Sequence, residues 1–138
     1  MKISGSARAL LAAAAVCSAP LAASAAPRYD GSTPLLCAPT TVSECTPDGA
    51  CKRVSAEAVN LPQFLKIDVK AQKVYSEETG RASPSRNIEH LSGQLILQGG
   101  QDGRGWTMTV SEETGRMSAT ITTEGEGFVV FGACTTVQ

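Results

Sequence analysis

The most distinctive polar stretch of the sequence is GGQDGRG, residues 99–105, which is followed at once by Trp106. Its glycines could present backbone N–H groups to an anion, and Arg104 would add a positive charge. The stretch lacks the lysine and the Ser/Thr ending of a phosphate-binding loop, and no apparent helix follows it. We expect a flexible hairpin loop here, with Asp102, Arg104 and Trp106 as the candidate ligand-binding residues. Trp106 would be either a core anchor or a stacking surface at the rim of a pocket.

Catalytic groups are sparse. His90 is the only histidine, and serines with Asp68 or Asp102 could complete a Ser-His-Asp arrangement only on paper, because no serine stands in a GxSxG turn. The paired acids at 77–78 and 112–113 match a glycosidase in number, but adjacent residues of a turn point apart into water. The sequence therefore predicts no catalytic residue and no cofactor, and we expect a protein that is not an enzyme.

Four cysteines could bind a metal or form disulfides: Cys37, Cys45, Cys51 and Cys134. Zinc sites use closely spaced cysteine pairs with further cysteines or histidines, and these spacings do not match, so we expect no metal. Four cysteines permit three disulfide pairings. The turn residues of CTPDGAC favour a bond between Cys45 and Cys51, which leaves Cys37 to pair with Cys134.

The hexapeptide SEETGR occurs twice, at residues 76–81 and 111–116. In the second copy, Thr114-Gly115 lies midway between two alternating apolar sets, where a hairpin must reverse. The sequences that flank the two copies do not match. We therefore interpret the repeat as one type of turn used twice, in preference to a duplicated recognition element.

Alternation of apolar and polar residues predicts strands at 65–70, 95–97, 106–111, 117–122 and 128–132. Glycine-containing turns separate the last three of these runs, which is typical of an antiparallel meander. With two short pieces near the cysteines, the chain has about seven or eight strands, a number that suits a small barrel. The expected fold is all-β, an antiparallel meander that forms a small barrel or a strongly bent sheet, stapled by disulfides.

The N-terminus predicts export. Lys2 and Arg8 precede an apolar run at residues 9–17, and small residues follow it, which is the pattern of a signal peptide. We place the signal peptide at residues 1–25, with the cut before Ala26. The apolar run is too short for a permanent transmembrane helix, which needs about 20 residues.

Cys17 raises a lipoprotein alternative, because a lipid-modified cysteine also follows an apolar run. Val16 stands where lipoprotein processing requires Gly, Ala or Ser, which favours a signal peptide that removes Cys17. Residues 26–138 are then a single small β-domain that begins with a polar, unstructured lead at 26–34. An even number of remaining cysteines agrees with a periplasmic or secreted location.

The charge balance argues against a nucleic-acid partner. The chain has 12 basic and 13 acidic residues, and removal of Lys2 and Arg8 leaves an excess of three acidic residues in the mature part. Nucleic-acid-binding domains are usually basic and carry clustered Lys and Arg. No run of like charges or of basic residues interleaved with aromatic ones stands in the sequence.

Three segments carry a resemblance: NLPQFLKIDV, LILQGGQDGRGWTMTVSEETGRM and FVVFGAC. Together they resemble small exported bacterial proteins of unassigned function, over most of the mature chain. The resemblance implies export and a compact, disulfide-containing β fold, and it transfers no catalytic or ligand-binding residue. Similarity to lipocalin-like barrels rests on strand count and size alone, and fold does not imply function.

The functional hypothesis is a non-enzymatic periplasmic module that binds a small molecule or acts as an accessory protein of the envelope. A meander able to enclose a pocket favours it. The alternative is a protein-protein module, such as an inhibitor of an envelope hydrolase, that presents residues 99–105 or the disulfide-braced loop at 45–51 to its partner.

Overall fold

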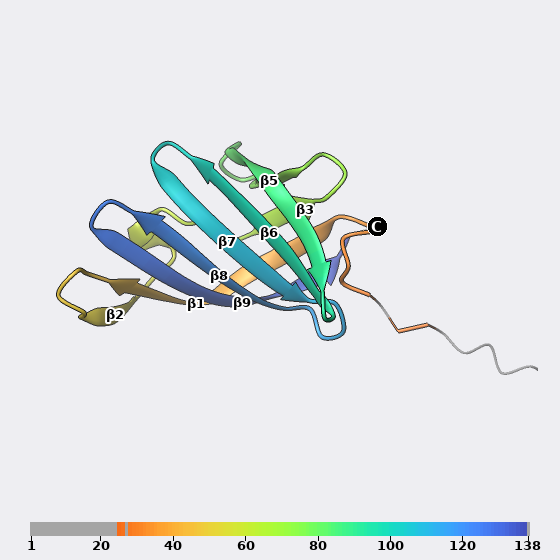
Figure 1. Ribbon diagram of the computed structural model, residues 1–138, viewed down its shortest axis with the longest axis horizontal. Helices are drawn as coiled ribbons and strands as arrows, with labels where there is room; N and C mark the ends of the chain where they lie inside the picture. The colour runs from red at the N-terminus through yellow and green to blue at the C-terminus, as the bar shows by residue number, and fades with distance from the viewer. Residues whose placement is uncertain (1–24, 27, 138) are drawn as a thin grey trace, which may run out of the picture.

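The computed structural model describes residues 25–26 and 28–137, so the expected signal peptide and Cys17 lie outside it except for Ala25. These described residues form nine strands and one short 3-10 helix, which confirms the all-β prediction (Figure 1). The elements are β1 (Leu35–Cys45), β2 (Cys51–Val54), η1 (Glu57–Val59), β3 (Leu65–Asp68), β4 (Lys73–Tyr75), β5 (Ala82–Leu91), β6 (Gln94–Gln101), β7 (Arg104–Ser111), β8 (Arg116–Thr123) and β9 (Glu126–Thr136).

β1 closes the sheet into a barrel because it pairs with β9 along one edge and with β3 along the other. From β3 to β9, each strand pairs antiparallel with the next one in the chain. Eight strands, β1 and β3 to β9, therefore form a closed antiparallel barrel. Of the two shapes that the sequence allowed, the barrel is the one observed, and closure satisfies sheet edges that an open meander would leave unpaired.

The second edge of β1 is divided between two partners. Residues 35–37 pair with β3, whereas residues 42–45 pair with β2, which forms a hairpin beside the barrel. Between these halves, the register of β1 with β9 shifts at Pro39 to Thr41. Proline has no N–H to donate and is tolerated in strands at such irregularities. The shift lets one strand serve both the barrel and the projecting hairpin, which Figure 1 shows at the end of β1.

Alternate residues of the strands point into the barrel and form its core, as the period of two requires. The largest fully buried side chains are Leu35, Ile67, Leu95, Leu97, Val110, Val130 and Cys37. Burial of an aliphatic side chain of this size contributes about 1.5–3 kcal/mol to folding.

The segment at residues 28–34 covers one end of the barrel, which corrects the expectation of an unstructured lead. The Tyr29 N–H donates to the Glu112 carbonyl oxygen over 3.0 Å, and the Tyr29 ring packs against the core. Gly31 is buried with φ of 76°, and a Cβ there would collide with Val69. Only glycine fits this left-handed position so close to the barrel. We call this end, which also holds the β7–β8 turn, the closed end.

The two SEETGR copies form the same turn, as predicted. In each copy the glycine N–H donates to the serine carbonyl oxygen over 2.9 Å. The serine hydroxyl accepts a hydrogen bond from the backbone N–H of the threonine, and the threonine hydroxyl accepts one from the backbone N–H of the arginine. Gly80 and Gly115 take left-handed conformations with φ of 67° and 70°. The first copy joins β4 to β5 and the second joins β7 to β8, so the copies lie at opposite ends of the barrel.

Both disulfides join residues that lie directly opposite each other in neighbouring strands. Cys37 bonds Cys134 across β1 and β9, at a sequence separation of 97, and Cys45 bonds Cys51 at the tip of the β1–β2 hairpin, at a separation of six. The predicted pairing is confirmed. The first bond fixes the seam at which the barrel closes, and the second braces a projecting hairpin.

We expect the two disulfides to stabilise the fold unequally. In the chain-entropy model, the long loop closed by Cys37–Cys134 contributes about 4–5 kcal/mol and the short loop of Cys45–Cys51 about 2 kcal/mol. Replacement of both cysteines of each pair by Ala, followed by urea unfolding, measures these losses. Equal losses, or a larger loss for Cys45–Cys51, would contradict the view that the seam bond is the main staple.

Candidate functional site

A cavity of about 640 Å³ opens at the end of the barrel opposite the closed end. This end, which we call the mouth, is formed by the β4–β5, β6–β7 and β8–β9 turns and by the connector between β2 and β3. The volume falls within the range of about 300–1,000 Å³ that is usual for small-molecule sites. The apolar wall of the cavity includes Trp106, Met108, Met117, Ala119, Ile121 and Val130.

The register of β6 to β9 explains why the cavity lies toward the mouth. Inward-facing residues form cross-strand rows, and the row nearest the closed end consists of Leu95, Val110, Met117 and Gly132. The middle row is Leu97, Met108, Ala119 and Val130, and the mouth row is Gly99, Trp106, Ile121 and Phe128. The closed-end row is packed in spite of Gly132, because a Cβ there would collide with the Met117 side chain, whereas the middle row has only a methyl group at Ala119. In the mouth row, the Trp106 ring occupies the space beside Gly99. The interior is therefore filled at the closed end and left open toward the mouth.

Trp106 is fixed at the mouth by two neighbours. Its indole Nε1–H donates to the Ser83 hydroxyl over 2.8 Å. Its ring lies against Gly99, directly opposite on β6, where a Cβ would collide with the ring and with the Pro84 carbonyl oxygen. An indole whose N–H is satisfied and whose ring is held against a glycine presents a rigid apolar surface to the cavity.

The glycine-rich stretch at 99–105 is shorter as a loop than the sequence suggested. It is a hairpin, as predicted, but the turn contains only Asp102 and Gly103, with φ of 53° and 74°. The other five residues belong to β6 and β7 and are paired in register. Asn-Gly and Asp-Gly favour this two-residue turn because both residues have positive φ. The predicted hairpin is confirmed, but its loop is shorter than expected, because Gly99, Gly100 and Gly105 belong to the paired strands.

All three candidate ligand-binding residues of the sequence line the cavity: Asp102, Arg104 and Trp106. Sequence reasoning missed Arg81, which also lines it, because the SEETGR repeat was interpreted only as a turn. It also missed the connector residues Asn60 and Leu61. The strand at residues 82–91 was not predicted either. With it, three strands lie between the two copies, and an odd number places their arginines at opposite barrel ends.

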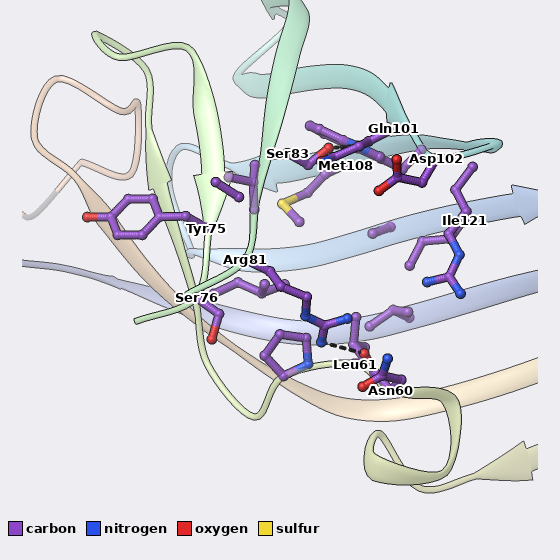
Figure 2. A pocket seen from close by; sticks show the side chains of 18 of the residues that line it. Asn60, Leu61, Tyr75, Ser76, Arg81, Ser83, Gln101, Asp102, Met108 and Ile121 are labelled. Atoms are coloured by element: carbon purple, nitrogen blue, oxygen red, sulfur yellow. Dashed lines mark hydrogen bonds between the residues drawn. The ribbon is translucent and has the colours of Figure 1, made fainter. Parts of the chain in front are cut away.

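Arg81 reaches across the mouth to the connector. Its Nη2–H donates to the Asn60 carbonyl oxygen over 2.8 Å (Figure 2). Its Nε–H donates to the Thr79 hydroxyl over 3.4 Å. Asn60 has a left-handed conformation with φ of 58° that ends the short helix η1. Figure 2 also shows that the Tyr75 ring points away from the cavity. The bond from Arg81 holds the connector over the mouth.

Arginines outnumber acidic residues in the lining of the cavity. Among the described residues that line the cavity, the charged ones are Arg81, Arg104 and Asp102. Glu77, in the same turn as Arg81, is bound to Lys66 on β3, and this hydrogen bond raises the pKa of the Lys66 ammonium group from its ordinary value. The Glu77 carboxylate is therefore paired with Lys66 and not with Arg81.

His90 lies far from the cavity, at the closed end. Its Nδ1 is 2.6 Å from a carboxylate oxygen of Glu112, whose other oxygen is 3.3 Å from Arg28. Asp68 accepts the Ala71 N–H over 2.9 Å in the β3–β4 turn. These groups fix turns and the segment at the closed end, and the structure does not bring His90 together with either aspartate that a catalytic arrangement would need.

No family model matches the chain, and no curated protein or solved structure matches it. Over residues 25–26 and 28–137, no helix is both long enough and apolar enough to cross a membrane. Within the same residues, no group of three or more His, Cys, Asp or Glu side chains could hold a metal ion.

The contact between Gly99 and Trp106 can be tested by the substitution Gly99→Ala. The added methyl group must displace the indole or the backbone, so we expect a loss of about 1–3 kcal/mol in the free energy of unfolding and a shift in the emission of Trp106, the only tryptophan. Gly127→Ala is the matched control, because a Cβ there meets no atom within 4 Å. Equal behaviour of the two variants would show that Gly99 does not set the position of the ring.

Proposed function

We propose that this protein is exported, is not an enzyme, and binds a small apolar ligand inside its barrel. The observation that carries the proposal is the cavity of about 640 Å³ with an apolar wall. Eight-stranded barrels either fill their interior with side chains or hold one small ligand. Here the side chains leave a space at Ala119, and the space is bounded by an indole ring and two methionine side chains.

The types of side chain in the wall support an adaptable apolar site. Met108 and Met117 have unbranched thioether side chains that adjust to irregular shapes. Trp106 supplies a rigid flat surface. Leu95 and Val110, below the cavity, are fully buried, and residues 28–34 cover the far end. A ligand therefore enters through the mouth and meets a solid floor.

Export is part of the same proposal. Two disulfides favour an oxidising compartment, because cytosolic thiols are kept reduced. The N-terminal pattern of charged, apolar and small residues adds to this, although residues 1–24 lie outside the described part of the chain. We propose the periplasm as the site of action, where a ligand-binding or accessory protein has access to envelope components.

A second candidate function is a protein-protein module, and the β1–β2 hairpin favours it. The loop between Cys45 and Cys51 is exposed and braced, since Asp48 accepts hydrogen bonds from the Thr46 hydroxyl and the Ala50 N–H. A braced loop loses little entropy on binding. The other loop that the sequence offered, residues 99–105, is a tight hairpin at the mouth.

Replacement of residues 46–50 by a Gly-Ser turn would abolish inhibition of envelope hydrolases if this candidate is correct.

Binding inside the barrel predicts that filling the cavity abolishes it. The neutral fluorophore N-phenyl-1-naphthylamine should bind the wild-type protein with increased emission, and Ala119→Leu should weaken this binding by about tenfold or more, because the new side chain occupies the space. Ala119 is 8% exposed and lies between Met108 and Val130 in the middle row.

Ala133→Leu is the matched control, because Ala133 is exposed on β9. It should bind the fluorophore as the wild type does, and thermal melts check that both variants fold. Wild-type affinity in Ala119→Leu, or no binding by the wild type, would overturn the cavity as the ligand site.

A further inference from the structure

We propose that the ligand is an anionic amphiphile: a single apolar chain that ends in a carboxylate or phosphate group. Its chain would lie in the cavity, and its charged group would lie between Arg81 and Arg104 at the mouth. This inference rests on the proposed function, because it concerns the same cavity, and it adds the chemical class of the ligand. The observation behind it is the position of two arginines over an otherwise apolar space.

The charge of the cavity lining differs from the charge of the whole chain. The full sequence has 12 basic and 13 acidic residues, yet the cavity is lined by two arginines and one aspartate. Arginine recognises carboxylate and phosphate groups through paired N–H donors in a planar fork. Two such groups beside an apolar opening match a ligand whose head is anionic and whose tail is not.

Arg81 is held in position and keeps donors free. It uses one Nε–H toward Thr79 and one Nη2–H toward the Asn60 carbonyl oxygen. A guanidinium group has five N–H donors, so about three remain for a ligand. Because both neighbours accept hydrogen bonds without charge, they fix the side chain and leave its positive charge uncompensated. A fixed donor loses less conformational entropy when it binds than a free one does.

Neither arginine is neutralised by a protein carboxylate. Over residues 28–137, the ion pairs with Asp or Glu involve Arg28, Lys52, Lys66 and His90, and Arg81 and Arg104 are not among them. Asp102 is the one acidic group among the described residues that line the cavity. It forms no ion pair with Arg104, and its charge opposes that of an incoming anion. The lining of the cavity therefore has one more arginine than it has acidic residues, although Glu78 and Glu124 stand in turns at the same end of the barrel.

The arrangement suits the energetics of an amphiphile. An ionised group is costly to bury without a partner, whereas a charge kept at the rim remains hydrated and still meets the arginines. The apolar chain gains by leaving water for the wall formed by Met108, Met117 and Ile121. A neutral ligand of the same length would gain from burial of its apolar chain but not from contact with the arginines.

Two probes that share a chain and differ in charge test the inference. The first measurement is displacement of N-phenyl-1-naphthylamine by dodecanoate and by 1-dodecanol, below the solubility of each. We expect dodecanoate to bind about tenfold more tightly than 1-dodecanol in the wild type, and salt to weaken only the binding of dodecanoate. Dodecyl phosphate is the third probe, and its rank against dodecanoate distinguishes a lipid phosphate from a free carboxylate as the natural head group.

The chain offers a matched pair of variants. Arg81 and Arg116 occupy the same position of the SEETGR repeat, at the mouth and at the closed end respectively. The double variant R81Q/R104Q should lose the preference for both anions and keep its affinity for 1-dodecanol. The double variant R86Q/R116Q removes the same charge from exposed residues outside the cavity and should keep the preference.

The outcomes separate this inference from the function on which it rests. If R81Q/R104Q loses the preference for anions and R86Q/R116Q keeps it, an anionic head group at the mouth is supported. Equal affinity for the anions and for 1-dodecanol in the wild type, or equal behaviour of the two double variants, overturns the inference and leaves an apolar-ligand barrel. Failure of the neutral fluorophore and of all three displacing probes to bind overturns the proposed function as well.

Discussion

The structure depends on β1 pairing with two partners at once, β9 on one edge and β3 on the other. Without this double pairing, the meander from β3 to β9 would be an open sheet whose apolar face must find another cover. With it, alternate residues of every strand enclose an interior. Cys37 and Cys134 lie directly opposite each other at the seam, so the bond between them holds the first and last barrel strands in one register.

The contents of that interior distinguish the two ends of the barrel. At the closed end, Leu95 and Val110 are fully buried, and the segment at residues 28–34 covers them. Toward the mouth, Ala119 contributes little volume, and the Trp106 ring stands where a side chain on β6 would otherwise lie. The cavity opens at one end because the small residue Ala119 stands where a larger side chain would fill the space. Its polar groups gather at the rim, as they do in sites that bind a molecule with one polar end.

Much of this architecture could be predicted from local sequence patterns. Most of the strands, the turns at SEETGR and the two disulfides follow from alternation and turn chemistry, because each depends on residues that are near one another in the chain or on a count of cysteines. The strand β5 was missed because residues 82–91 do not alternate between apolar and polar side chains. The cavity could not be predicted in the same way. Its volume depends on which residues share a row, and Gly99 faces Trp106 only because a two-residue turn at Asp102 sets the register. Arg81 was missed for a related reason, since its role depends on the end of the barrel at which its turn lies.

The central claim is that the barrel contains an open apolar space between Trp106 and Ala119 that accepts a ligand. The most direct test is a crystal structure of residues 26–138 with N-phenyl-1-naphthylamine. We expect density for the fluorophore inside the barrel, in contact with Trp106 and Met108, with residues 28–34 unchanged at the closed end. The account would be contradicted if the side chain of Trp106 or Met108 filled the space and the fluorophore were absent or bound on the outer face.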